Sequence, residues 1–173
     1  FNELDGGADY ILEFLKPLRA AFKGLYRRDY VLMGGGFEGQ EWVSSTGYYS
    51  GHFAQKWLAI QPTEALAYLR VGEFHRMVEG RAVESYIFLD IPELMIAAGQ
   101  WPIKDSPGRN RGYTGFLPGP AGDDGVMVES QDPAQSEKSF RIVSDMLVRL
   151  ATEDQAWRPY WHDNMVWYGP GAF

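Results

Sequence analysis

The first hundred residues change from a helical to a strand-like hydrophobic pattern. Apolar residues recur at helical spacing near the start: Ala8, Ile11, Leu15, Leu18 and Phe22. Pro17 lacks a backbone N–H, so we expect it to kink or restart this helix. Strand-like runs follow at residues 30–33, 42–49, 64–77 and 81–89, with turns at the glycines 34–36 and at the Glu79–Gly80 pair. One helix followed by a meander of strands indicates an α+β class.

The pattern changes again after residue 101. Residues 102–134 are rich in proline and glycine, which predicts a linker or an arm draped over the protein. Asp132 and Pro133 then form a helix start, with Asp132 as the cap. An apolar stripe follows at Phe140, Val143, Leu147 and Leu150. A short turn leads from this helix to a predicted strand over residues 165–168.

Composition narrows the classes of protein and site. The chain has 173 residues, 45% of them hydrophobic, and a net charge of −7, which disfavours a nucleic-acid partner. It has no cysteine, which excludes disulfides, thiolate zinc ligands and cysteine nucleophiles. The histidines at 52, 75 and 162 lack the short spacing of a zinc site. No apolar stretch approaches the ~20 residues of a membrane span, so we expect a cytoplasmic protein with no membrane partner.

The segment "GEFHRMVEGRAVESYIFLDIPELMIAAGQWP" joins a strand, a glycine hairpin, a second strand, Asp90 and a short helix over residues 92–99. This order resembles the SnoaL-like branch (polyketide or ester cyclases) of the NTF2-like superfamily. The tail "YWHDNMVWYGPGAF" resembles the opening of the same family, and the first residues resemble the family segment that comes directly after that opening. The resemblance implies a cone, in which a strongly curved, mostly antiparallel sheet wraps around helices and encloses a pocket.

The resembling segments occur in an unusual order, because the second portion of the family pattern comes first. We interpret the chain as part of a tandem protein. Residues 1–101 form one SnoaL-like domain, 102–134 the linker or arm, and 135–173 the start of a second repeat. Alternatively, residues 135–173 complete the first repeat by supplying its helix and first strand, which would cover the apolar stripe.

The resemblance also implies a function. Such a protein binds a small, largely apolar carbonyl compound and catalyses its cyclisation or isomerisation by acid/base chemistry, without metal or cofactor. It forms a homodimer through the sheet. The alternative is a non-catalytic module of the same fold that binds a ligand or dimerises, because fold does not determine function.

Two residues are the catalytic candidates. Asp90 stands where the family has its acid/base carboxylate, and a pocket that desolvates a carboxylate raises its pKa. The same residue could equally be a helix cap, since Asp90 and Glu93 form a capping box. His75 shares a strand face with Leu69, Val71 and Glu73. It is either a polar group of the pocket or a core histidine.

The predicted ligand-binding residues divide between the two faces of the third strand run. Glu73 lies beside His75 and would orient or charge it, whereas Arg70 and Arg76 alternate to the opposite face. The remaining candidates are aromatic: Trp42, Tyr86 and Phe88. Aromatic side chains on strands more often pack on the sheet than bind a substrate. Sequence alone leaves open which face lines a pocket, and a bulge at Gly72 would exchange the two.

Overall fold

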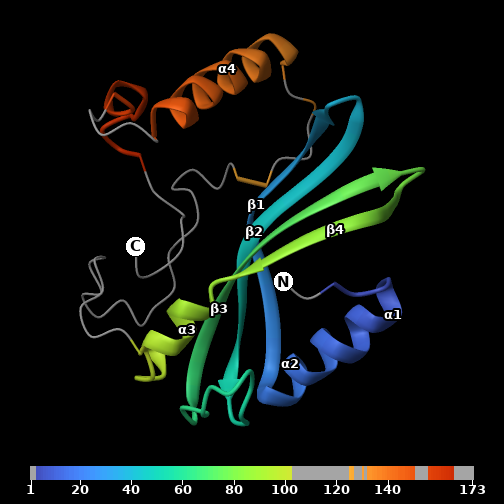
Figure 1. Ribbon diagram of the computed structural model, residues 1–173, viewed down its shortest axis with the longest axis vertical. Helices are drawn as coiled ribbons and strands as arrows, with labels where there is room; N and C mark the ends of the chain where they lie inside the picture. Colours follow the sequence, from blue (N-terminus) through green and yellow to red (C-terminus); the bar gives the residue numbers. More distant parts are fainter. Residues whose placement is uncertain (1–2, 103–124, 127–129, 131, 151–155, 166–173) are drawn as a thin grey trace. The chain divides into compact units, whose positions relative to one another are not determined.

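A computed structural model describes residues 3–102, 125–126, 130, 132–150 and 156–165 of the chain. The chain divides into two compact units, one formed by residues 1–126 with 169–173 and the other by residues 127–168. Among the described residues, unit 1 contains the sheet, three short helical segments that precede it and one short helix that follows it, and unit 2 contains the long helix α4 (Figure 1). Each unit is described by itself.

The N-terminal helix changes its winding before Pro17. It runs as α1 (Gly7–Asp9), the π-helix η1 (Tyr10–Leu15) and α2 (Lys16–Ala21). The Lys16 N–H donates to the Ile11 carbonyl five residues earlier, which is the π-helical bond. The prediction that proline disturbs the helix is confirmed, since Pro17 donates no hydrogen bond to the preceding turn. Phe22, which we expected on this helix, instead begins the first strand.

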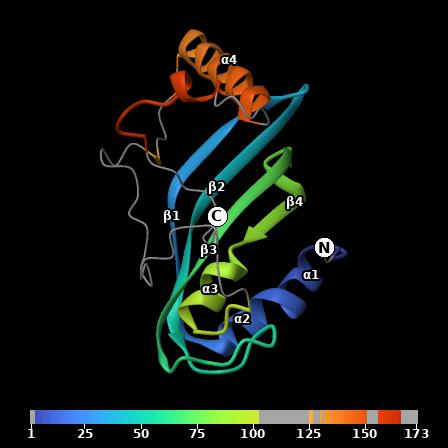
Figure 2. The same ribbon diagram turned by 60° about the vertical axis from the view of Figure 1, so that its left-hand side comes forward.

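Four antiparallel strands form one sheet in sequence order: β1 (Phe22–Phe37), β2 (Gln40–Phe53), β3 (Ala65–Val78) and β4 (Arg81–Leu89). Figures 1 and 2 show that the sheet is curved, with the helices of unit 1 lying against one face. The predicted α+β class with a curved antiparallel sheet is therefore confirmed. Membership of the SnoaL-like branch of the NTF2-like superfamily stays a prediction.

The same dipeptide closes both hairpins. Glu38 and Gly39 have φ of 51° and 74°, and Glu79 and Gly80 have 50° and 73°. Positive φ at both central residues is the signature of the type I′ turn, whose twist matches that of paired strands. The predicted turn at Glu79–Gly80 is confirmed, and the turn at Glu38–Gly39 went unrecognised.

The predicted turn at glycines 34–36 is wrong. These residues continue β1 and pair with Val43, Trp42 and Glu41 of β2. Glycine lacks a side chain to favour either a strand or a turn, so its neighbours decide, and the Glu38–Gly39 turn lies just beyond. His52 lies within β2, where it is exposed.

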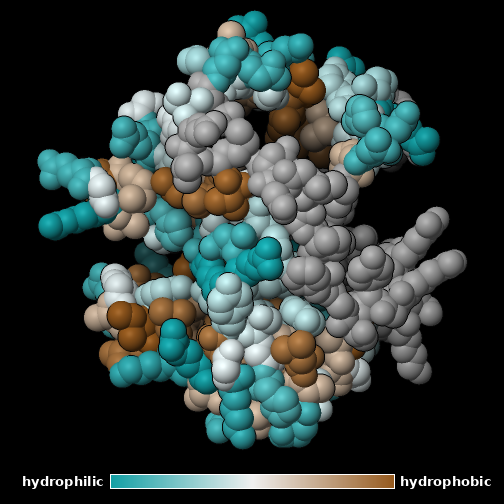
Figure 3. Space-filling view, turned by 180° about the vertical axis from the view of Figure 1, so that it is seen from behind, coloured by the Kyte–Doolittle hydropathy of each residue, from teal (hydrophilic) through white to brown (hydrophobic). Residues whose placement is uncertain are grey.

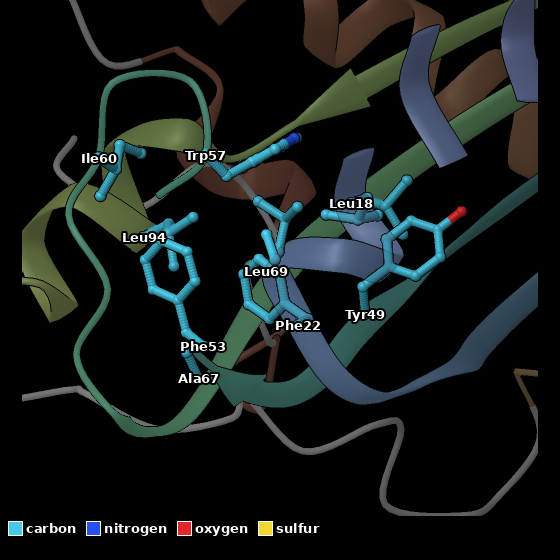
Figure 4. Packing of buried hydrophobic residues seen from close by; sticks show 11 residues of the cluster. Leu18, Phe22, Tyr49, Phe53, Trp57, Ile60, Ala67, Leu69 and Leu94 are labelled. Carbon is cyan, nitrogen blue, oxygen red and sulfur yellow. The ribbon is translucent and has the colours of Figure 1, made fainter. Parts of the chain in front are cut away.

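The hydrophobic core lies between one face of the sheet and the helices α2 and α3 (Ile91–Ala97). Leu18 of α2 and Leu94 of α3 are fully buried beside Phe22, Phe53 and Leu69. In Figure 4 these side chains converge, and Tyr49 lies at one end of the cluster with its hydroxyl pointing away from it. The core therefore ends at Tyr49.

The backbone of β1 passes close to Gly47 of β2. The register of the pair shifts between Asp29 and Val31, which indicates a bulge. A Cβ atom on Gly47 would overlap the carbonyl group of Arg28 and the Cα of Asp29. Glycine at position 47 thus permits the bulge that positions this part of β1.

Unit 2 is formed by α4 (Pro133–Leu150) and the short 3-10 helix η2 (Arg158–Tyr160). The Asp132 carboxylate accepts a hydrogen bond from the Ala134 N–H at 2.9 Å, so the predicted cap is confirmed. Much of the predicted apolar stripe is exposed, with Phe140 and Leu147 each at 57%. The predicted strand at 165–168 and most of the linker at 102–134 lie outside the described residues, and the predicted division into domains stays a prediction.

Hydrophobic side chains reach the surface in several separate places, between hydrophilic ones, on the side shown in Figure 3. In the part of the chain that the structure describes, no helix combines the length and the apolar character needed to cross a membrane.

Candidate functional site

A cluster of polar side chains begins on the sheet where the core ends. On β3, one face carries the buried residues Leu69 and Val71 and then continues with Glu73 and His75. Tyr49 and Ser45 of β2 pair with Leu69 and Glu73 across the two strands, so their side chains lie on the same face of the sheet. This is the face covered by the helices, so the predicted pair Glu73 and His75 lies on the covered face.

Arg27 of β1 is at the centre of this cluster. Its Nη1 donates to Glu73 Oε1 at 2.5 Å and to the Tyr49 hydroxyl at 3.1 Å. Its Nη2 donates to Asp29 Oδ1 at 2.8 Å and to Ser45 Oγ at 3.0 Å, and its Nε also donates to Asp29. We call these five residues, together with His75, the Arg27 cluster. The bonds hold Arg27 in one position and set two carboxylates against its single positive charge.

Glu73 connects Arg27 to His75. The glutamate is only 5% exposed, and its second carboxylate oxygen lies 3.1 Å from Nε2 of His75. The other ring nitrogen, Nδ1, lies 2.8 Å from the hydroxyl of Ser85, which is exposed on β4. A continuous series of polar contacts therefore runs from the half-buried guanidinium to the surface.

Two pKa shifts reflect how closely side chains pack around Tyr49, one of Arg27 in the cluster and one of Tyr10 on the N-terminal helix. Burial raises the pKa of Tyr10, and a hydrogen bond with Tyr49 raises it further. Burial alone would lower the pKa of Arg27, but its hydrogen bonds with Glu73 and Asp29 outweigh burial and raise it. Tyr10 therefore stays protonated and Arg27 stays charged, and both are donors at neutral pH.

Asp90 belongs to a second polar group, on the opposite face of β3. Its carboxylate accepts a hydrogen bond from the Glu93 N–H at 3.0 Å, so the predicted capping box has its cap in place at α3. Arg70 lies 3.9 Å from the Asp90 carboxylate and 3.2 Å from that of Glu93. Burial raises the pKa of Glu93, although the charge of Arg70 opposes this shift.

The predicted aromatic residues lie on this outer face as well. Trp42 stacks on Tyr86 with ring centroids 6.2 Å apart, and Phe88 meets Phe74 edge-on at 6.0 Å. Tyr86 and Phe88 are each about half exposed, at 48% and 54%. Arg76 binds Glu84 at 2.8 Å on the same surface.

The structure thus brings together only part of the predicted site. Glu73 and His75 are in contact, while Asp90, Arg70, Trp42, Tyr86 and Phe88 lie on the other face of the sheet. The prediction that the Glu73 and Arg70 sets occupy opposite faces is confirmed. Whether any of these residues is catalytic or binds a ligand stays a prediction.

Sequence reasoning missed Arg27 and Ser85. Arg27 lies in the part of β1 that we did not expect to be a strand, so its alternation with Asp29 was not considered. Ser85 lies on a predicted strand, but the two-residue turn at Glu79–Gly80 alone would pair His75 with Glu84, and a register shift between Arg76 and Met77 pairs it with Ser85 instead. The regular hairpin register therefore did not identify Ser85, because the shift in β4 has no clear signal in the sequence.

Across the described residues, no group of three or more His, Asp or Glu side chains is arranged to hold a metal ion.

No protein-family profile and no curated protein matches the sequence. Among solved structures, the chain is similar to AclR, a proposed hydroxylase from Streptomyces galilaeus, with 19% identity and a TM-score of 0.48. The similarity covers 60% of this chain and 64% of AclR. At this level, the similarity to AclR carries no information about chemistry.

Proposed function

We propose that unit 1 binds a small, largely apolar carbonyl compound beside the Arg27 cluster and catalyses a proton transfer on it, as in cyclisation or isomerisation. The observation that supports this proposal is the buried Glu73 carboxylate, which lies between Arg27 and the partly exposed His75. A carboxylate that orients an imidazole reachable from solvent is a recurrent acid/base arrangement.

Each member of the cluster has a distinct role. Arg27 offsets the charge of Glu73, which allows the carboxylate to remain buried. Glu73 fixes the orientation of the His75 ring, and His75 exchanges the proton with the compound. In this proposal Asp90 only caps α3. The alternative is that Asp90 is the acid/base carboxylate, as the family resemblance implies, and the experiment below distinguishes the two.

Apolar side chains near the cluster are suited to an apolar compound. Leu32 pairs with Ser45 across β1 and β2, and Val43 pairs with His75 across β2 and β3. Both side chains therefore lie on the same face of the sheet as the Arg27 cluster. Leu32 is exposed, at 39%. These side chains would contact the hydrocarbon part of the compound.

The proposal is tested by proton exchange at an activated carbon. The probe is 2-tetralone in D₂O, and NMR follows the loss of its α-proton signal in the presence of the protein. We expect the wild-type chain to accelerate exchange and His75→Gln to reduce that acceleration by roughly 10²-fold or more, the usual contribution of a general base. Asp90→Asn should exchange at the wild-type rate.

Three outcomes have different meanings. If Asp90→Asn abolishes exchange while His75→Gln retains it, Asp90 is the base and our assignment is wrong. If the wild-type chain does not accelerate exchange, the catalytic proposal fails. Chemical-shift changes confined to the Arg27 cluster on addition of 2-tetralone would then favour the non-catalytic binding module.

A homodimer formed through the sheet is the second candidate, and the outer face favours it. Phe74, Tyr86 and Phe88 lie together there, each about half exposed. Apolar side chains gathered on one sheet face are typical of contact surfaces. Light scattering should give twice the chain mass for the wild type and a smaller mass for Phe88→Ser. Leu32→Ser, on the face of the Arg27 cluster, is the matched control, and a monomeric wild type would contradict this candidate.

A further inference from the structure

We infer that Ser85, His75 and Glu73 form a nucleophile, base and carboxylate triad that accepts acyl groups from small esters. This activity differs from the proposed proton transfer, although it uses the same histidine and glutamate. Triads of this kind are recognised by geometry and by the role of each group, whatever their order in the sequence.

The contacts match the three roles. Ser85 Oγ lies 2.8 Å from Nδ1 of His75, within the reach that a base needs to take the hydroxyl proton. Nε2 of His75 lies 3.1 Å from Glu73 Oε2. A carboxylate can only accept, so the proton of the neutral ring lies on Nε2 and Nδ1 is left as the acceptor for the serine.

The sheet holds the three groups in place. Ser85 and His75 are directly paired across the β3–β4 hairpin, and Glu73 is two residues from His75 on the same face. Arg27 anchors the glutamate from the far side at 2.5 Å. Sites built on strands are more precise than sites on loops, and here two adjacent strands supply the whole triad.

Exposure also follows the order that the chemistry requires. Glu73 is buried, the His75 side chain is 26% exposed, and Ser85 is exposed. The nucleophile therefore meets the ester from solvent, while the carboxylate that orients the base stays out of water. Ser45, on the same face, differs because its hydroxyl accepts from Arg27.

The reaction proceeds in two balanced steps. Ser85 Oγ forms a bond to the ester carbonyl carbon as its proton passes to Nδ1 of His75. The carbon–oxygen bond to the leaving group breaks, and the leaving oxygen takes the proton from Nδ1. Water then attacks the acyl-serine by the same route, with His75 taking its proton and returning it to Ser85, so that one ester and one water give an acid and an alcohol.

The test uses p-nitrophenyl acetate with the full chain. Intact-mass spectrometry should show the addition of one acetyl group, and peptide mapping should place it on Ser85. Ser85→Ala should lose this modification. His75→Gln should form it at least roughly 10²-fold more slowly, because a general base contributes about that much. Glu73→Gln should also be slower, with a changed pH profile of acylation.

Two controls keep the result interpretable. Ser44→Ala removes a serine from the opposite face of the sheet and should acylate like the wild type. Ser85→Ala should retain the exchange of 2-tetralone protons, so failure of the triad and failure of the proposed proton transfer are distinguishable. Acetylation absent from Ser85 in the wild type, or equally fast in His75→Gln when circular dichroism shows a folded variant, would overturn the inference.

Discussion

Arg27 reaches across β2 to bind Glu73, which is 46 residues away in the sequence. The two residues belong to β1 and β3, which do not pair with each other, so the ion pair joins strands that the backbone ladder leaves separate. Because the Glu73 side chain is only 7% exposed, the guanidinium is what allows a carboxylate to be buried there.

Removing one partner of this pair should destabilise unit 1 strongly. We expect Arg27→Met to lower the free energy of unfolding by about 3 kcal/mol, since it leaves the Glu73 charge buried without compensation. The double variant Arg27→Met with Glu73→Leu should recover most of that loss. Urea unfolding of the two single variants and the double variant gives the coupling. Additive effects would contradict a direct interaction between the two side chains.

Gly47→Ala should be far more damaging than Gly72→Ala. The added Cβ at position 47 would overlap backbone atoms of β1, which cannot move without disturbing the bulge, whereas nothing lies within 4 Å of a Cβ at position 72. We expect a loss of about 2 kcal/mol or more at position 47, typical of overpacking. Thermal unfolding of both variants checks this, and similar melting temperatures would show that β1 and β2 approach less closely than described.

Tyr10 should make stability depend on pH in the alkaline range. Its pKa is raised, by burial first and then by the hydrogen bond with Tyr49, so the folded protein holds this proton more tightly than the unfolded chain. The resulting stability is present below pH ~10, the ordinary tyrosine value, and is lost as pH rises through the raised pKa.

Urea unfolding at pH 9 and pH 11 measures this dependence. Tyr10→Phe should show a smaller loss of unfolding free energy between the two pH values than the wild type. The control is Tyr26→Phe, because Tyr26 is 63% exposed. This variant should lose as much unfolding free energy between the two pH values as the wild type does. An unchanged dependence in Tyr10→Phe would mean that its hydroxyl is not protected in the folded state.

Asp90 offers a test that separates capping from chemistry. Asp90→Ala should lower the unfolding free energy by about 1 kcal/mol, because the Glu93 N–H loses its acceptor at the start of α3. Asp90→Asn should cost much less, since asparagine caps about as well as aspartate. Thermal unfolding of the two variants gives the comparison. Equal losses would mean that the charge facing Arg70, and not the cap, is what matters.

The sequence predicted the fold class and the Glu79–Gly80 hairpin because each depends on local patterns. The type I′ turn needs positive φ at two residues, and the glycine of the dipeptide adopts it at little steric cost. The glycines 34–36 misled for a related reason. A glycine run resembles a turn, but the strand continues through it, because pairing with β2 and the turn just beyond it decide its conformation.

The Arg27 cluster could be predicted only in part. Strand alternation placed Glu73 with His75, a short-range relationship on one strand. The contact between Arg27 and Glu73 depends on the full length of β1, on its bulge and on the reach of a side chain across an intervening strand. None of these leaves a periodic signal in the sequence. The cap at Asp90, by contrast, could be predicted, because the capping pattern of Asp90 and Glu93 lies within four residues of the sequence, and the structure contains this cap.

The in-order arrangement of the strands also affects how quickly the sheet can assemble. Each hairpin closes through a two-residue turn, and hairpins of this kind form in roughly 1–10 μs. Joining the two hairpins requires closure of the longer connection at residues 54–64, which costs more chain entropy. We therefore expect the docking of β2 on β3 to limit the folding rate. In stopped-flow experiments, substitutions where β2 pairs with β3 should slow folding more than substitutions in either two-residue turn. Equal effects on the folding rate would contradict this order of assembly.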